Sequence, residues 1–377
     1  MSASTPSFEQ GPIRPPSEAH SLLVRAIRNC TWNRCTFCPV YKGSASSLRP
    51  LEDVLADVDA MAAAAKVLEE RGVGAIHGGL VPQEAYQVAL FLRGGGRTVF
   101  LQDADPCAVK PEKLAAVIGR VRERFPAVAR VTTYGRAATL ARRTPEQLAL
   151  LADAGLTRVH LGLESGADEV LMAIDKGCSS GDLIAAGENV VGAGLELCFY
   201  LMPGLGGRAA AAAHVAGSAR VLRAVAAAAP AERPLVVRLR TAAVVPGTPL
   251  AEREGAGEFV LPDDVEVAQE LRDLLGQLGD ARLDLRSDHA LNLLPGLDGS
   301  LPVDRGRLIA MLDEFLDLPR DEQARYAVGA RLGIYSDLGD RLDARRRALL
   351  EQQFAGYGQP TADELLQEAT ALRARFL

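Results

Sequence analysis

The sequence predicts an α/β fold built on a parallel sheet. Within residues 21–250, six short apolar runs alternate with stretches in which apolar residues recur every three or four positions. That order predicts parallel strands joined by right-handed helical crossovers. With 377 residues and 48% hydrophobic content, the chain can bury one large core, or one large and one small core.

The individual elements follow from short local patterns. Apolar runs predict strands at residues 21–27, 97–102, 129–134, 157–162, 195–202 and 235–240. Helical periodicity predicts helices at residues 51–71, 84–93, 111–125, 168–174, 182–193 and 209–228. One further helix is bounded by a capping box, Thr144 to Gln147 with Pro145 at the first helical position, and by a C-cap glycine, Gly155.

The two ends of the chain differ from this alternating region. Residues 1–20 carry Pro, Ser and Glu without periodicity, which predicts a flexible leader. After residue 250 the alternation stops, and residues 267–278 and 307–316 read as amphipathic helices. We therefore expect three parts: a leader at 1–20, a domain at 21–250 and a helical C-terminal region at 251–377.

Charge and hydropathy exclude some functions. The net charge of −6, from 42 basic and 48 acidic residues, gives no general attraction to nucleic-acid phosphates, so nucleic acid is not an expected partner. No apolar run approaches the roughly 20 residues that a membrane span requires. The N-terminus lacks a basic segment followed by an apolar core, and free thiols fit a reducing compartment, so we expect a cytoplasmic protein.

Three cysteines, Cys30, Cys35 and Cys38, fall within nine residues directly after the first expected strand. Clustered thiolates select iron–sulfur clusters, zinc or copper(I) over hard cations. A closed structural zinc site requires four ligands, and neither His20 nor any other cysteine stands at a short zinc-like spacing from the three. Three thiolates on a four-iron cluster leave one iron open. Zinc with a fourth ligand from elsewhere in the chain remains the alternative.

This loop resembles the cluster loop of the radical S-adenosylmethionine (SAM) superfamily, in which SAM chelates the open iron. Phe37 matches the aromatic residue that those proteins carry near the adenine of SAM. The family's usual spacing is C-x3-C-x2-C, whereas this chain has C-x4-C-x2-C, and the extended loop is similar to that of mostly uncharacterised bacterial members. A loop absorbs an extra residue more easily than a helix does. The resemblance implies a partial (β/α)6 barrel, a [4Fe-4S] cluster and SAM.

The same resemblance implies SAM-binding residues at strand ends, where ligands bind in both barrels and doubly wound sheets. Asp103 and Asp105 follow the second strand, where the family binds the ammonium group of SAM, although the alternative is that they cap the next helix. Glu164 lies in a Gly-x-Glu-Ser-Gly segment similar to one that contacts the ribose of SAM. Lys176, a dozen places later, matches a basic residue that contacts the SAM carboxylate.

Gly204 and Gly206 lie in a Gly-rich turn after the fifth strand, which the family places beside SAM. Outside the resemblance, His289 stands in an Asp-His-Ala-Leu-Asn segment that could close the open side of a barrel and contact substrate. Cys107 follows the second strand and could face the site, but a buried and inert thiol explains it equally well.

We therefore expect a radical SAM enzyme that cleaves SAM reductively and abstracts hydrogen from an unidentified small-molecule substrate. An electron donor such as flavodoxin or ferredoxin is the implied protein partner. One alternative is a non-catalytic iron–sulfur or SAM-binding protein related to anaerobic coproporphyrinogen oxidase. Another is a zinc-stabilised barrel. The identity of the catalytic residue does not follow from the sequence.

Overall fold

The computed structural model describes residues 5–354 and 360–376. Its main sheet has eight strands in the order β1-β4-β5-β6-β7-β8-β9-β10, and a small second sheet pairs β2 with β3. This topology confirms the predicted α/β fold of the partial-barrel type with a helical C-terminal region. The chain divides into two compact units. The first is Met1–Asn33, Val40–Gly162 and Ala185–Cys198, and the second is Arg34–Pro39, Leu163–Ile184 and Phe199–Leu377.

The first unit holds the N-terminal strands and helices. Its strands are β1 (Leu22–Arg25), β2 (Ile27–Arg28), β3 (Ser47–Leu48), β4 (Thr98–Gln102), β5 (Arg130–Gly135) and most of β6 (Leu156–Glu164). Its α-helices are α1 (Leu51–Arg71), α2 (Gly74–His77), α3 (Ala85–Arg93), α4 (Pro111–Arg124), α5 (Ala137–Leu140) and α6 (Pro145–Ala154). Short 3-10 helices lie at η1 (Pro16–Glu18) and η2 (Pro106–Ala108). Helix α8 (Ser180–Gly192) and strand β7 (Glu196–Leu201) are divided between the two units.

The second unit holds the remaining elements. Its α-helices are α7 (Asp168–Ala173), α9 (Gly207–Ala228), α10 (Pro249–Gly255), α11 (Asp264–Leu278), α12 (Arg305–Leu316), α13 (Arg320–Arg331), α14 (Ala344–Phe354) and α15 (Ala362–Leu372). Its own strands are β8 (Leu235–Leu239), β9 (Leu283–Arg286) and β10 (Gly299–Leu301), and its 3-10 helices are η3 (Leu338–Leu342) and η4 (Arg373–Phe376).

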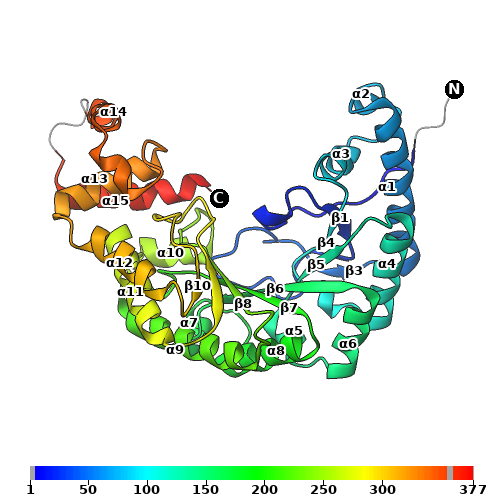
Figure 1. Cartoon of the computed structure of the whole chain (residues 1–377), viewed down its shortest axis with the longest axis horizontal. Coiled ribbons are helices and arrows are strands. Elements are labelled where there is room, and N and C mark those ends of the chain that lie inside the picture. Colours follow the sequence, from blue (N-terminus) through cyan, green and yellow to red (C-terminus); the bar gives the residue numbers. More distant parts are fainter. Residues whose placement is uncertain (1–4, 355–359, 377) are drawn as a thin grey trace. The chain divides into compact units, whose positions relative to one another are not determined.

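In the first unit, β1, β4, β5 and β6 pair in parallel, and α1 and α4 pack side by side (Figure 1). On α1, Val54 and Val58, whose spacing predicts the helix, are no more than 2% exposed, and Leu51 and Leu55, which share that spacing, are partly exposed. Burial of such side chains supplies roughly 25 cal/mol per Å² of apolar surface, which is the main force that holds helices on a sheet. Val54 and Val58 therefore fix the orientation of the helix that they predict.

The predicted boundaries of α6 are confirmed. The hydroxyl of Thr144 accepts a hydrogen bond from the backbone N–H of Gln147, and the Gln147 side chain accepts one from the N–H of Thr144. Gly155 ends the helix with a φ of 115°, in the left-handed region that favours glycine. This helix begins and ends where the sequence signals placed it.

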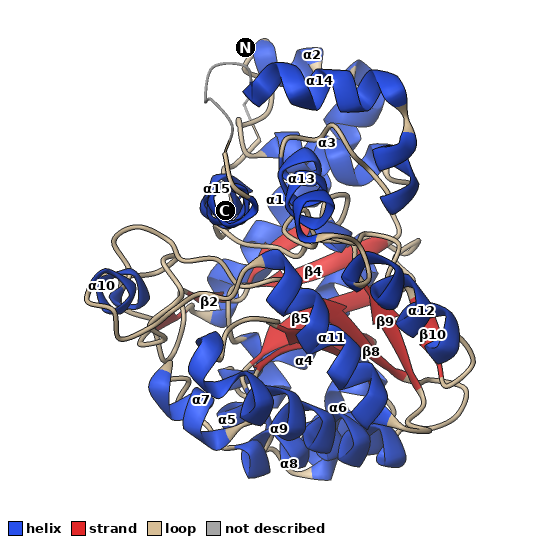
Figure 2. Ribbon diagram, turned by 90° about the vertical axis from the view of Figure 1, so that its left-hand side faces the viewer, coloured by secondary structure: helices blue, strands red, loops and turns tan. Residues whose placement is uncertain are grey.

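The sheet continues beyond the six predicted strands. In the second unit β8 pairs in parallel with β9, and β9 pairs antiparallel with β10, as Figure 2 shows. Both added strands are only three or four residues long, which explains why no apolar run indicated them. Helix α9 packs on α11, and α13 on α15 (Figure 1).

The expected leader, residues 1–20, is described from residue 5 onwards. Phe8 is 4% exposed, and Glu9 forms ion pairs with Arg25 and Arg28. The side-chain amide of Gln102 donates a hydrogen bond to the backbone carbonyl of Gly11 at 3.1 Å. The described part of this segment is therefore held by side chains of the first unit. Among the residues that the structure describes, no helix has the length and apolar character needed to cross a membrane.

Candidate functional site

An ion pair stands at the end of β6, in the second unit. The ammonium Nζ of Lys176 donates to Oε1 of Glu164 at 2.8 Å, and the two side chains are only 14% and 12% exposed. Glu164 has a φ of 56°, which is uncommon for a residue other than glycine. Such a conformation costs on the order of 1–3 kcal/mol and tends to occur at functional sites. The sequence-predicted pair is thus brought together by a strained turn.

The electrostatic surroundings of Lys176 keep it charged. Burial of the ammonium group would lower its pKa, but the neighbouring Glu164, Cys35 and Cys178 raise that pKa above its ordinary value. Lys176 therefore carries a positive charge at neutral pH and lies within electrostatic reach of one motif cysteine. Its charge suits a ligand carboxylate.

Residues 34–39 of the cysteine loop belong to the second unit. The backbone N–H of Thr36 donates to the carbonyl of Ile174 at 2.9 Å, and the N–H of Leu250 donates to the carbonyl of Thr36 at 3.1 Å. The ring of Phe37 packs against a buried apolar cluster made of Ala167, Val170, Ile174, Met202, Leu205, Ala242, Leu250 and Phe259. Phe37 itself is partly exposed.

The three motif cysteines form no disulfide and are partly exposed. Cys35 and Cys38 belong to the second unit, where the N–H of Cys38 donates to the carbonyl of Cys35 at 3.3 Å. Cys30 belongs to the first unit, and its sulfur accepts a hydrogen bond from the N–H of Asn33 at 3.4 Å. Within the described residues, no three His, Cys, Asp or Glu side chains form a group that could hold a metal ion.

The Gly-rich turn after β7 is fixed by its own packing. Gly204 has a φ of 86°, and its N–H donates to Oε1 of Glu270 at 2.8 Å. A Cβ at Gly206 would lie 3.0 Å from the carbonyl oxygen of Ala210 and from Cβ of His214. Both glycines are therefore required by the turn itself, and the amide of Gly204 already has a protein acceptor.

Asp103 is fully buried in the first unit. Its Oδ2 lies 2.6 Å from a guanidinium nitrogen of Arg25 and accepts the N–H of Asn29 at 3.1 Å. Its Oδ1 faces Gly11, where an added Cβ would come within 2.0 Å. The carboxylate thus holds the residues that lead into the cysteine loop.

Asp105 is also fully buried and has several donors. It accepts hydrogen bonds from the hydroxyls of Thr31, at 2.8 Å, and Thr139, at 2.6 Å, and from the N–H of Arg136 at 3.1 Å. Burial raises the pKa of this carboxyl above its ordinary value, although these hydrogen bonds oppose the rise. Together with Asp103 it ties β4 to the start of the cysteine loop, a role that the sequence analysis had not assigned.

The Asp-His-Ala-Leu-Asn segment is joined to the end of β8 by its asparagine, Asn292. Asn292 accepts hydrogen bonds from the N–H and hydroxyl of Thr241 and donates to the carbonyl of Leu239, which fixes the end of β8. His289 accepts a hydrogen bond from the N–H of Leu291, and burial, aided by Arg240, lowers its pKa to about 4. Cys107 is 1% exposed, which agrees with a buried thiol.

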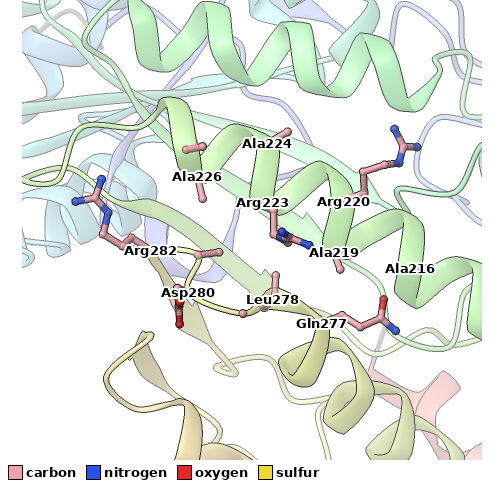
Figure 3. Close-up of a pocket in the computed structure, with 13 residues that line it drawn as sticks. Ala216, Ala219, Arg220, Arg223, Ala224, Ala226, Gln277, Leu278, Asp280 and Arg282 are labelled. Atoms are coloured by element: carbon pink, nitrogen blue, oxygen red, sulfur yellow. The ribbon is translucent and has the colours of Figure 1, made fainter.

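A hollow of about 1090 Å³ lies between the C-terminal parts of α9 and α11 (Figure 3). Alanines form much of its wall, and Arg220, Arg223 and Arg282 stand around it. The lining comes from the C-terminal half of α9, which precedes β8, and from the end of α11 and the loop that precedes β9, so the hollow lies at the N-terminal ends of these strands. Ligands of parallel sheets bind at the opposite edge, and the hollow is therefore separate from the Glu164 site.

Comparison with known families decides the classification. The family model of the radical SAM superfamily matches residues 24–210. The match contains all three motif cysteines together with Glu164 and Lys176. Residues 24–210 belong to the radical SAM superfamily. Radical SAM proteins normally use an iron–sulfur cluster and SAM. No curated protein sequence matches the chain.

Several solved structures resemble the chain at low identity. The archaeal Elp3 of Methanocaldococcus infernus is 17% identical, with a TM-score of 0.42 over 54% of this chain and 52% of its own. The cobalamin-dependent SAM radical enzyme OxsB is 13% identical, with a TM-score of 0.45 over 94% of this chain and 53% of its own. Coproporphyrinogen III oxidase (HemN) from Escherichia coli, a radical SAM enzyme, is 16% identical, with a TM-score of 0.42 over 95% of this chain and 90% of its own. The chain thus spans about half the length of the first two.

Proposed function

We propose that this radical SAM protein binds SAM at the end of β6 and holds a [4Fe-4S] cluster on Cys30, Cys35 and Cys38. The observation that carries this proposal is the Glu164–Lys176 pair, with Cys35 among the groups that raise the pKa of Lys176. One cation and one anion beside a cluster cysteine suit a zwitterionic nucleoside ligand.

The side chains have the donor types that both cofactors require. Thiols are the soft ligands that iron–sulfur clusters use, and the three partly exposed motif cysteines would leave one iron available to SAM. The carboxylate of Glu164 can accept two hydrogen bonds from ribose hydroxyls. The ammonium of Lys176 pairs with a carboxylate, and the partly exposed Phe37 can contact the adenine.

When bound, the two cofactors would supply one-electron reductive cleavage of SAM and abstraction of a hydrogen atom from the substrate. The chain's own residues bind SAM and orient it. Lys176 neutralises the ligand carboxylate, Glu164 fixes the ribose, and the buried apolar cluster under Phe37 keeps water from that side of the site. The substrate proposed is a small molecule, in a cytoplasmic protein that receives its electron from a donor such as flavodoxin or ferredoxin.

The test is an anaerobic incubation of iron- and sulfide-reconstituted protein with dithionite and SAM, followed by mass-spectrometric quantification of 5′-deoxyadenosine. Product that depends on Cys35, shown by its loss in Cys35→Ala, supports the proposal. Cys198→Ala is the matched control because Cys198 is buried and lies outside the motif. A protein that carries a full cluster, binds SAM and makes no 5′-deoxyadenosine would instead fit a non-catalytic binder, and one that binds only zinc would fit the zinc-stabilised barrel.

A further inference from the structure

A buried serine–histidine pair stands next to Glu164 in the second unit. The hydroxyl Oγ of Ser165 lies 2.8 Å from Nδ1 of His214, and these residues are 0% and 1% exposed. The same Oγ accepts a hydrogen bond from the N–H of Ala167 at 3.1 Å. The serine side chain is thereby fixed between the turn after β6 and helix α9.

A buried carboxyl group continues this chain of contacts. Oε1 of Glu270, on α11, lies 3.3 Å from Nε2 of His214 and accepts the N–H of Gly204 at 2.8 Å. Burial lowers the pKa of His214 to about 4, so the imidazole is neutral at pH 7. Burial also raises the pKa of Glu270 to about 7, although the N–H of Gly204 opposes the rise. A neutral histidine can bridge a hydroxyl and a carboxyl group in either tautomer.

These contacts connect the Glu164 segment, which the proposed function assigns to SAM, with the Gly-rich turn that the family resemblance places beside SAM. Ser165 directly follows Glu164, whose left-handed backbone requires outside support. Gly204 belongs to the Gly-rich turn after β7. The carbonyl of Glu164 also accepts the N–H of Met202 at 3.0 Å, at the start of that turn. A displacement of the His214 side chain would therefore disturb both the Glu164 segment and the Gly204 turn.

Helix α9 lies unusually close to the same turn. A Cβ at Gly166 would lie 2.3 Å from the carbonyl oxygen of Gly217, and the hydroxyl of Ser218 accepts the N–H of Gly166 at 3.0 Å. Side chains from α9 therefore fill the space directly beneath the Glu164 segment. This close approach is what brings His214 within reach of Ser165.

The three side chains have the composition of a nucleophilic triad, but their burial excludes that chemistry. No substrate can reach a serine with 0% exposure, and none of the three touches solvent to a useful extent. The group is held by the hydrogen bond between Ser165 and Nδ1 of His214 and by the one from Gly204 to Glu270, while Nε2 of His214 and Oε2 of Glu270 have no hydrogen-bond partner among the described residues. Buried polar contacts of this kind restrict the segments that they join to one arrangement. Positioning is thus the role that remains for these residues.

We infer that Ser165, His214 and Glu270 form a positioning network that holds Glu164 and the Gly204 turn in the geometry that binds SAM. This inference rests on the proposed function, because it assigns the network to the same cofactor site. The three residues act through Glu164 and Gly204 and do not touch the cofactor themselves.

The test measures SAM binding to reconstituted wild-type protein and to Ser165→Ala, His214→Ala and Glu270→Gln, together with thermal unfolding of each. Ser165→Ala removes one hydroxyl without added bulk, so it remains informative if His214→Ala folds poorly. Glu270→Gln keeps an oxygen that can accept the N–H of Gly204. The matched control is Gln323→Ala, which removes a 5% exposed side chain that donates to the carbonyls of Phe315 and Leu316.

We expect His214→Ala and Ser165→Ala to raise the dissociation constant of SAM by about tenfold, as loss of a supporting partner usually does. The KM for SAM should rise with them, while the rate at saturating SAM is retained, and Glu270→Gln should bind close to the wild-type value. Variants that lower the melting temperature but bind SAM like wild type would overturn the inference, as would a Gln323→Ala variant with an equal loss of affinity. Wild-type protein that binds no SAM would overturn the proposed function and this inference with it.

Discussion

The Nζ of Lys176 lies 2.8 Å from Oε1 of Glu164, across a turn in which Glu164 has a φ of 56°. Both side chains are largely shielded, so the pair is less screened by solvent than a surface ion pair. The turn therefore presents one fixed anion and one fixed cation at the end of β6.

Replacing Lys176 by alanine should weaken SAM binding by about tenfold or more, because a charge-assisted bond to the ligand carboxylate is lost. Isothermal titration of reconstituted protein measures the effect. Lys113→Ala, which removes an exposed lysine on α4, is the control and should bind SAM like wild type. Equal affinity in Lys176→Ala and Lys113→Ala would remove Lys176 from the SAM site.

Asp103→Ala should reduce the free energy of unfolding of the metal-free protein by roughly 3 kcal/mol, because it leaves Arg25 without its buried partner. Asp59 is the comparison, since it pairs with Arg120 and Arg124 at the surface, and Asp59→Ala should cost less than about 1 kcal/mol. Urea unfolding measures both values. If Asp103→Ala leaves stability unchanged and only SAM binding falls, Asp103 is a ligand-binding residue and not a structural one.

Most of the fold could be predicted from the sequence because the patterns that indicate its strands and helices are local. Each predicted strand is an apolar run, and the capping box at Thr144 involves residues three positions apart, so neither requires knowledge of the tertiary structure. Strand β9 was missed because it is four residues long and is stabilised by its partners β8 and β10.

Site residues could be predicted from the sequence only where they belong to a recognisable motif. Glu164 and Lys176 were found from a segment pattern, and the structure brings them together. His214 had no recognisable partner in the sequence, because Ser165 and Glu270 come from different elements and meet only after packing. A lone buried histidine in an alanine-rich helix carries no local signal.

Asp264 is expected to make stability depend on pH. Its burial would raise its pKa, but Arg373 and Arg331 outweigh that effect and lower the pKa below its ordinary value. A lowered carboxyl pKa contributes stability that is present above the unfolded value of about 3.9 and is lost as the pH falls through the folded value.

The free energy of unfolding of wild type should therefore exceed that of Asp264→Asn by a margin that is constant at neutral pH and shrinks below about pH 4. Urea titrations from pH 7 down to pH 3 measure this margin. A margin that grows as the pH falls would have the wrong sign for this ion pair.

Gly166→Ala should destabilise the protein by about 2 kcal/mol or more, because the new Cβ would meet the backbone of Gly217, which has no side chain to move aside. Gly181→Ala is the matched control. Its Cβ would have no neighbour closer than 3.6 Å within helix α8, so it should raise stability by up to about 1 kcal/mol. Urea unfolding of the two variants gives the comparison, and equal stability of both would show that α9 does not approach the turn this closely.

The most direct test of the central claim is electron paramagnetic resonance of the reconstituted, dithionite-reduced protein before and after addition of SAM, with iron and zinc determined on the same sample. A cluster held by three cysteines with one open iron predicts about four iron atoms per chain and a reduced-cluster signal that changes when SAM binds. Both features should be lost in Cys35→Ala and retained in Cys198→Ala. Stoichiometric zinc without iron, or a cluster signal that SAM leaves unchanged, would contradict the claim.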